Sequence, residues 1–316
     1  MNIGILGTSE IAFRRFLPAL EKFPQITYAG VATWTTEKAK SFVDTFGGKI
    51  YEGYDALLAD RNIEAVYVPL PPALHFEWGK KVLQAGKHLL MEKPFTTKLK
   101  NTNELLSLAN ERGLTIHENY MFLYHRQLAK IKELILSGDL GDVRLYRMSF
   151  GFPKRAENDF RYNRGLGGGA LLDCGGYPVR LALEMLGNGA RVAQARLCQP
   201  DGYEVDLYGS AVLENEDGIC AQLSFGMDNA YQCQLEVWGS KATLIAPRIF
   251  TAGADMRIKL VERTSYNESI IELQEDDQFL HSIEQFYNAV QDSVINTDKI
   301  ALQAKIMDEI RAVGEV

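Results

Sequence analysis

The chain has 316 residues, 46% of them hydrophobic and 24% charged, and a formal net charge of −7 at pH 7. This composition is typical of a globular protein with room for two domains, and the negative charge argues against a nucleic-acid or membrane-surface partner. We see no apolar run long enough to span a bilayer, no basic leader, and no C-x-x-C spacing among the four cysteines. We therefore expect a cytoplasmic protein with reduced thiols and no metal site.

Over the first 120 residues, strand-like and helix-like segments alternate. Apolar strands are expected at 2–6, 26–32, 65–70, 88–91 and 114–119. Helices are expected at 10–22, at 37–47 with a stop at Gly47, at 74–87 with a stop at Gly86, and at roughly 98–112. This order predicts a parallel sheet covered by helices on both faces.

After about residue 140 the pattern changes to alternating apolar and polar residues. Three successive runs, 204–213, 218–225 and 231–238, each place apolar side chains on one face. They predict an antiparallel sheet with one buried face. Two helices are expected after them, at 276–292 and 301–313.

The loop GTSEIA, Gly7 to Ala12, lies where a dinucleotide-binding protein has G-x-G-x-x-G. Gly7 keeps the glycine of the tight turn, and Ala12 is small enough for close helix–strand packing. Ser9 replaces the glycine that approaches the pyrophosphate, but its hydroxyl can donate a hydrogen bond, and the helix N-terminus still attracts phosphate. We predict that Thr8 and Ile11 join these three in binding a cofactor; an ordinary strand–helix turn is the alternative.

The end of the second strand, VATWTTEKAK, lacks the carboxylate that an NAD site usually places there. Thr33 could donate to a 2′-phosphate, Lys38 could neutralise it, and Trp34 could stack on the adenine. We therefore predict NADP rather than NAD, with NAD as the alternative. Lys38 is also interpretable as a solvated helix lysine.

Two further stretches carry residues suited to chemistry. In AGKHLLMEKPF, Glu92 and Lys93 directly follow a strand, where ligands bind in open parallel sheets. In LGGGALLDCGGYP, Asp173 and Tyr177 are four residues apart, so a helix would point both into one cleft. Asp173 as a helix N-cap and Tyr177 as an interior tyrosine are the alternatives. His75 and His125 are each a candidate cleft-lining residue or a structural histidine.

These stretches resemble the glucose–fructose oxidoreductase, inositol dehydrogenase and MocA (Gfo/Idh/MocA) family, with AVYVPLPPALH, EKP, HENYMFLYHRQ and GGGALLD as the shared motifs. IAFRRFLPA and VWGSKATLIAPRIFT are most similar to its nucleotide-sugar 3-ketoreductase branch. Leu123 and Arg126 depart from an arginine and a proline that are common in the family.

The resemblance implies an α/β protein with an N-terminal Rossmann domain, residues 1–120, and a C-terminal α/β domain with an open, mainly antiparallel sheet, residues 121–316. It leaves room for the last helix to pack back on the first domain. It also implies a nicotinamide cofactor and a homodimer or homotetramer joined through the sheet faces. In the family the lysine of EKP lies at the active site, which assigns that role to Lys93. Other cofactor contacts are expected from Leu70, Pro71, His75 and Glu92.

The residue types agree with hydride transfer to or from a ketone. The carbonyl oxygen then needs a proton donor, and a phenol such as Tyr177 can serve if the Lys93 ammonium lowers its pKa. Asp173 could fix Lys93 or bind a sugar hydroxyl. Substrate phosphates would need basic residues, for which the candidates are Arg161, Arg164 and Arg248.

We therefore predict an NADP(H)-dependent oxidoreductase that exchanges a hydride with a secondary alcohol or ketone of a sugar or nucleotide sugar. Its substrate-binding residues are expected to be Lys93, Arg161, Asp173 and Tyr177. The alternatives are a dihydrodiol or simple aldose dehydrogenase, and a dinucleotide-binding sensor without catalysis.

Overall fold

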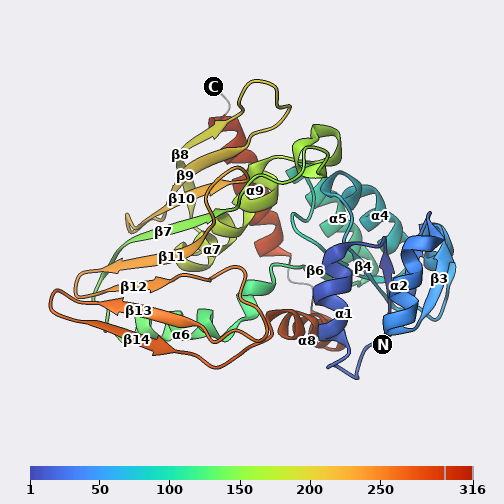
Figure 1. The fold of residues 1–316 in the computed structure, drawn as a ribbon. Helices are drawn as coiled ribbons and strands as arrows, with labels where there is room; N and C mark the ends of the chain where they lie inside the picture. Colours follow the sequence, from blue (N-terminus) through green and yellow to red (C-terminus); the bar gives the residue numbers. More distant parts are fainter. Residues whose placement is uncertain (295–296, 315–316) are drawn as a thin grey trace. The chain divides into compact units, whose positions relative to one another are not determined.

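The computed structural model describes residues 1–294 and 297–314 (Figure 1). The chain divides into two compact units, each with its own sheet. The first unit comprises Met1–Tyr120 and Phe279–Ala301, and the second comprises Met121–Gln278 and Leu302–Val316.

The first unit is built on a six-stranded parallel sheet with the strand order β3-β2-β1-β4-β5-β6. Its strands are β1 (Asn2–Leu6), β2 (Thr27–Thr33), β3 (Lys49–Glu52), β4 (Ala65–Val68), β5 (His88–Met91) and β6 (Ile116–Glu118). Its helices are α1 (Leu17–Leu20), α2 (Thr36–Phe46), α3 (Tyr54–Ala59), α4 (His75–Gln84), α5 (Leu99–Arg112) and most of α8 (Gln278–Gln291). The order reverses between β1 and β4, so the predicted Rossmann fold is confirmed.

Burial explains why these segments adopt their structures. All four residues of β4 are buried, as expected for a parallel strand covered on both faces. Helix α4 buries Trp78, Val82 and Leu83, and the chain leaves it at Gly86, whose φ of +74° confirms the predicted stop. The pair β3–α3 is not predicted from the sequence because the residues of β3, KIYE, are only half-buried or exposed.

The second unit is built on an eight-stranded mixed sheet with the order β14-β13-β12-β11-β7-β10-β9-β8. Its strands are β7 (Val143–Gly151), β8 (Arg191–Cys198), β9 (Tyr208–Glu214), β10 (Cys220–Gly226), β11 (Gln232–Gly239), β12 (Thr243–Ala246), β13 (Lys259–Arg263) and β14 (Glu268–Glu272). Its helices are α6 (Arg126–Leu136), α7 (Gly176–Leu186) and most of α9 (Asp298–Gly314). All neighbouring strands are antiparallel except β7 and β10, which confirms the predicted mainly antiparallel sheet.

The three predicted alternating runs form β9, β10 and β11, and each buries one face. Their order differs from a simple succession, because β7 lies between β10 and β11. Helix α7 packs against β7 and β10, and Gln303 of α9 donates to the carbonyl of Gly176 at the start of α7, at 2.9 Å. The buried face of this sheet therefore supports α7, which carries Tyr177.

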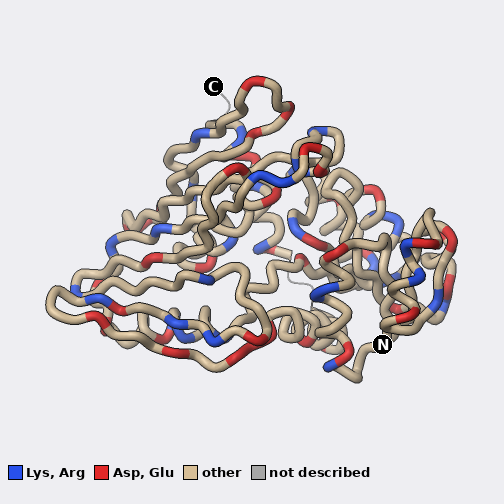
Figure 2. The backbone as a smooth tube through the Cα atoms, viewed as in Figure 1, with Lys and Arg blue, Asp and Glu red and all other residues tan. Residues whose placement is uncertain are grey.

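Charges of both signs are interspersed along the chain (Figure 2). On β13 and β14, for example, Arg263 pairs with Glu268 at 2.5 Å and Lys259 with Glu272 at 3.8 Å. None of the helices within 1–294 and 297–314 is long and apolar enough to cross a membrane.

Candidate functional site

Three loops leave the parallel sheet at one edge, because they follow the neighbouring parallel strands β1, β4 and β5. The first loop contains Gly7–Ala12, the second contains Leu70 and Pro71, and the third contains Glu92 and Lys93. The strand order reverses between β1 and β4, which is where open α/β sheets bind their ligands. The structure thus brings together the predicted cofactor residues of the first unit.

The Gly7 turn has the shape of a phosphate-binding loop. Its φ is +88°, and a Cβ at this position would lie 2.8 Å from Cδ2 of Leu70, so only glycine fits. Ser9 Oγ accepts a hydrogen bond from the Ala12 amide at 3.2 Å, which leaves the Ser9 hydroxyl proton as a donor. Ala12 is fully buried, whereas Thr8 and Ile11 are half-buried. The turn fits a pyrophosphate despite its missing second glycine.

The end of β2 fits the adenosine end of NADP. Trp34 is 71% exposed. One edge of its indole packs on Gly53, where a Cβ would lie 2.8 Å from Trp34 Cζ3. Lys38 is exposed, and Thr33 is buried with its hydroxyl accepting from the Thr35 amide at 3.1 Å. An exposed indole and a lysine, without a carboxylate at 33–36, suit an adenine and a 2′-phosphate.

His75 ties two of the three loops together. Its Nδ1 lies 2.8 Å from the carbonyl of Pro94 and its Nε2 lies 2.7 Å from the carbonyl of Leu70. Burial lowers the pKa of His75, so the ring is neutral near pH 7 and donates from one nitrogen only. His75 therefore has a structural role, which is one of the two interpretations of the sequence. Its contact with a cofactor stays a prediction.

Glu92 is held by a chain of hydrogen bonds within the first unit. Its Oε1 accepts from Tyr67 at 2.7 Å and from Asn119 at 2.6 Å, and burial raises the pKa of its carboxyl. Asn119 Oδ1 accepts from Ser282 of α8 at 2.8 Å, and Ser282 lies 2.9 Å from His117 Nε2. This network fixes the residue before Lys93.

In the second unit, Asp173 is paired with Arg161. Nε of Arg161 donates to Asp173 at 2.7 Å and Nη1 donates to Asp159 at 3.1 Å. Burial disfavours the charge of Arg161, but the two carboxylates outweigh it and raise its pKa. Asp173 lies inside the turn Leu171–Gly175, with Ala170 at the N-cap, so the N-cap interpretation of Asp173 is wrong.

Tyr177 lies in the first turn of α7 among aromatic rings. The ring centroids of Phe150, Phe250 and Phe122 lie 4.9, 5.8 and 5.9 Å from its own. The side chain is 7% exposed. Asp173 precedes it by four residues within continuous helical backbone, as the spacing predicts.

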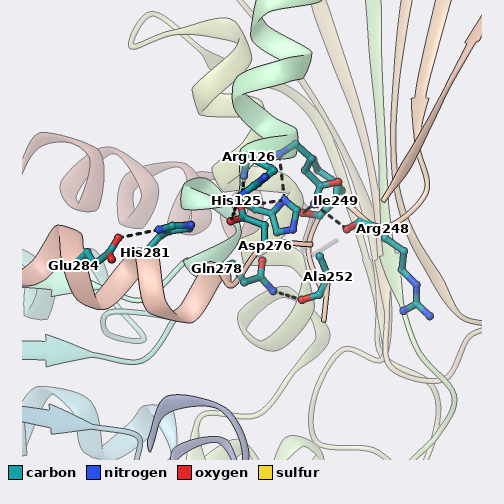
Figure 3. A network of polar contacts seen from close by, with 10 residues as sticks. His125, Arg126, Arg248, Ile249, Ala252, Asp276, Gln278, His281 and Glu284 are labelled. Atoms are coloured by element: carbon teal, nitrogen blue, oxygen red, sulfur yellow. Dashed lines mark hydrogen bonds and ion pairs between the residues drawn. The ribbon is translucent and has the colours of Figure 1, made fainter. Parts of the chain in front are cut away.

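His125 belongs to a buried polar cluster (Figure 3). Its Nδ1 accepts from the Gln127 amide at 3.1 Å and caps α6, and Asp276 Oδ2 lies 3.9 Å away. Arg126, which departs from the family pattern, donates to Asp276 through its amide at 2.6 Å and its guanidinium at 3.2 Å. His125 is a structural histidine, the second of the two interpretations.

Several partners are missed by the sequence analysis. Asp206 accepts from the Leu171 amide at 2.7 Å and so caps the turn that carries Asp173. Ser282 gives no sequence signal, since its bond to Asn119 spans 163 positions. Asp159 is two residues before Arg161, so its ion pair with Arg161 is the one contact among these that the sequence could have predicted. Among the side chains that the structure describes, no group of three His, Cys, Asp or Glu is placed to hold a metal ion.

Comparison with known proteins identifies relatives over nearly the whole chain. Residues 1–120 match the model of the Gfo/Idh/MocA oxidoreductase family with an NAD-binding Rossmann fold, and residues 128–245 match its C-terminal domain. A dTDP-3,4-didehydro-2,6-dideoxy-alpha-D-glucose 3-reductase of Streptomyces violaceoruber is 43% identical over 292 residues, 92% of this chain and 85% of that protein. A D-xylose 1-dehydrogenase (NADP(+)) of Haloferax volcanii is 30% identical over 294 residues, 92% of this chain and 89% of that protein.

A solved structure is also similar over nearly the whole chain. A 3-ketoreductase from Actinomadura kijaniata, in complex with NADP and TDP-benzene, has a TM-score of 0.97 and 38% identity, and covers 99% of this chain and 98% of its own. These findings confirm the family resemblance, the fold and the predicted oxidoreductase class. They do not favour the sensor or the dihydrodiol dehydrogenase.

Proposed function

Because the chain belongs to the Gfo/Idh/MocA oxidoreductase family, we propose that it is an NADP(H)-dependent ketoreductase of a dTDP-linked sugar. The observation that carries this proposal is the full-length similarity to 3-ketoreductases of that substrate class, which exceeds the similarity to an aldose dehydrogenase. The sheet edge described above supports it, because the turn at Gly7 and the end of β2 fit the cofactor. We assign cofactor binding to Gly7, Thr8, Ser9, Ile11, Ala12, Thr33, Trp34, Lys38, Leu70, Pro71, His75, Glu92 and Lys93.

The reaction needs a proton at the carbonyl oxygen. NADPH, when bound, supplies a hydride to the carbonyl carbon. Tyr177 gives its phenolic proton to the oxygen, and the Lys93 ammonium stabilises the charge that develops there. Asp173, held in position by Arg161, accepts a hydrogen bond from a sugar hydroxyl.

The assembly and location are part of the proposal. Residues 1–120 bind the dinucleotide, and residues 121–316 bind substrate and join subunits into a homodimer or homotetramer. The exposed face of the eight-stranded sheet supports this, because Tyr208 and Trp238 on it are 46% and 47% exposed. The enzyme acts in the cytoplasm.

Lys93→Met tests the mechanism. We expect kcat to fall about 100-fold or more, since the variant loses the group that assists proton transfer. NADPH binding, followed by cofactor fluorescence, should stay within about threefold of the wild type, because one contact among many is lost. Lys100→Met, at an exposed position of α5, is the matched control.

An unchanged kcat in Lys93→Met would refute the assigned chemistry. Tyr177→Phe should show the same loss of turnover. Reduction of free aldoses but of no dTDP-linked ketosugar would instead favour the aldose dehydrogenase.

A further inference from the structure

The three arginines considered for substrate phosphates differ in what already compensates their charge. Arg161 pairs with two carboxylates, as described above. Arg164 directs Nε to the carbonyl of Glu204 at 2.7 Å and Nη2 to that carbonyl and to Gln199 at 3.4 Å. Arg248 forms no ion pair with any residue of the described part of the chain, and its one side-chain hydrogen bond there goes to Tyr231. Arg248 therefore has the most remaining capacity to bind an anion.

Arg248 lies in a group of hydrogen-bond donors. Its Nη1 donates to the Tyr231 hydroxyl at 2.6 Å, and the guanidinium lies 4.8 Å from the centroid of the same ring. The Tyr231 hydroxyl lies 2.7 Å from Thr251 Oγ1. Tyr231 is 43% exposed. A guanidinium with free N–H groups beside two hydroxyls is a donor set that suits phosphate oxygens.

The backbone that carries Arg248 is fixed on its inner side. The buried amide of Gln127 donates to the carbonyls of Arg248 at 3.1 Å and Ile249 at 3.4 Å. The Ile249 amide donates to the carbonyl of Cys233 at 3.1 Å. Figure 3 shows the guanidinium of Arg248 pointing away from the cluster around His125 and Asp276. The side chain thus extends outward from an immobilised segment, which reduces the entropy lost on binding.

The same segment contacts the proposed proton donor. Phe250, two residues after Arg248, is fully buried, and its ring centroid lies 5.8 Å from that of Tyr177. Two residues of extended chain span at most about 7 Å. Arg248 therefore lies two residues from a ring that packs on Tyr177, which places the two side chains in the same region of the second unit.

We propose that Arg248, Tyr231 and Thr251 bind the diphosphate of the nucleotide-linked sugar. This inference rests on the proposed function and names the part of the substrate that it recognises. Arg248 binds the phosphate oxygens through its remaining N–H groups. Of the Tyr231 and Thr251 hydroxyls, the one whose proton is not used in the hydrogen bond between them donates beside it. In a chain of net charge −7, this group supplies the local positive charge that a diphosphate requires.

The test measures binding of dTDP, thymidine and inorganic pyrophosphate to the full-length enzyme by calorimetry, with NADPH present. In Arg248→Ala we expect a dissociation constant for dTDP raised about 10- to 100-fold, since each factor of ten is 1.4 kcal/mol and charged hydrogen bonds are worth about 1.5–3. Thymidine binding should be unchanged. Tyr231→Phe, which keeps the ring, should weaken dTDP less. Arg263→Ala is the matched control, since that arginine is on β13 in the same unit with its side chain 55% exposed.

The outcomes separate this inference from the proposed function. If the wild type binds dTDP and Arg248→Ala binds it equally well, the inference is wrong while the proposed function stands. A loss confined to Arg161→Ala or Arg164→Ala would also overturn it, by assigning the diphosphate elsewhere. If the wild type binds neither dTDP nor pyrophosphate, both fail. Thermal melting of each variant checks folding, and Arg248→Lys, which keeps the charge, should recover part of the affinity.

Discussion

Removal of the Arg161 guanidinium should destabilise the second unit and leave nucleotide binding nearly unchanged. The side chains of Arg161 and Asp173 are 21% and 10% exposed, and their Nε–Oδ2 distance is 2.7 Å. Loss of one partner from a fully buried ion pair costs about 3–5 kcal/mol. Water still reaches part of this guanidinium, and hydrogen bonds to charged groups contribute about 1.5–3 kcal/mol. We therefore expect Arg161→Met to lower the free energy of unfolding by about 2 kcal/mol.

Urea denaturation of Arg161→Met, Asp173→Asn and the double variant measures this directly. The coupling energy of the cycle should reach about 1 kcal/mol or more, because the two residues share a hydrogen bond. Arg164→Met is the control, since that side chain pairs with a carbonyl and an amide at the surface. A coupling energy near zero would refute the reasoning. So would a large loss of dTDP affinity in Arg161→Met without loss of stability.

Three further predictions concern the first unit. Gly7→Ala should weaken NADPH binding about tenfold, because a Cβ at φ +88° is strained by about 1–2 kcal/mol and would meet Leu70 at 2.8 Å. Gly86→Ala, with φ +74° and no atom within 4 Å, should leave NADPH binding unchanged; equal effects would contradict this interpretation. Burial raises the pKa of Glu92, so its protonated form favours the fold, and stability from this group is lost as pH rises above about 4.5. The wild type should accordingly lose free energy of unfolding relative to Glu92→Gln as the pH rises above about 4.5, and a constant difference would argue against it. Lys38→Glu should reduce the preference for NADPH over NADH about tenfold; an unchanged ratio of dissociation constants would place the 2′-phosphate elsewhere.

Local patterns are enough to predict five of the six strands of the first sheet, but only three of the eight strands of the second. The apolar runs of β4 and β5, the alternation in β9 to β11 and the stops at Gly47 and Gly86 depend on residues only a few positions apart. Such signals reflect backbone preference and the period of burial, which a single segment carries. The short strand β3 is not predicted, because its residues are not buried enough to show an alternation of apolar and polar side chains.

Residue types at the candidate site are likewise readable from motifs, but their partners are not. Arg161 is predicted to bind a substrate phosphate, and its pairing with Asp173, twelve positions away, is not predicted. Ser282 and Asn119 join across 163 positions. Which charges compensate each other depends on the buried groups that packing brings within about 3 Å. The periodicity of the sequence does not predict these contacts.

The position of β7 in the sheet is likewise not predictable from local sequence. This strand is not predicted from the sequence, although its burial alternates in the structure, and its place between β10 and β11 depends on long-range pairing. Sequence neighbours compete with distant strands for the same backbone hydrogen bonds, and the total burial of the folded sheet resolves that competition. The motifs therefore predict the enzyme class, whereas the packing decides that Arg161 pairs with carboxylates and that Arg248 pairs with Tyr231.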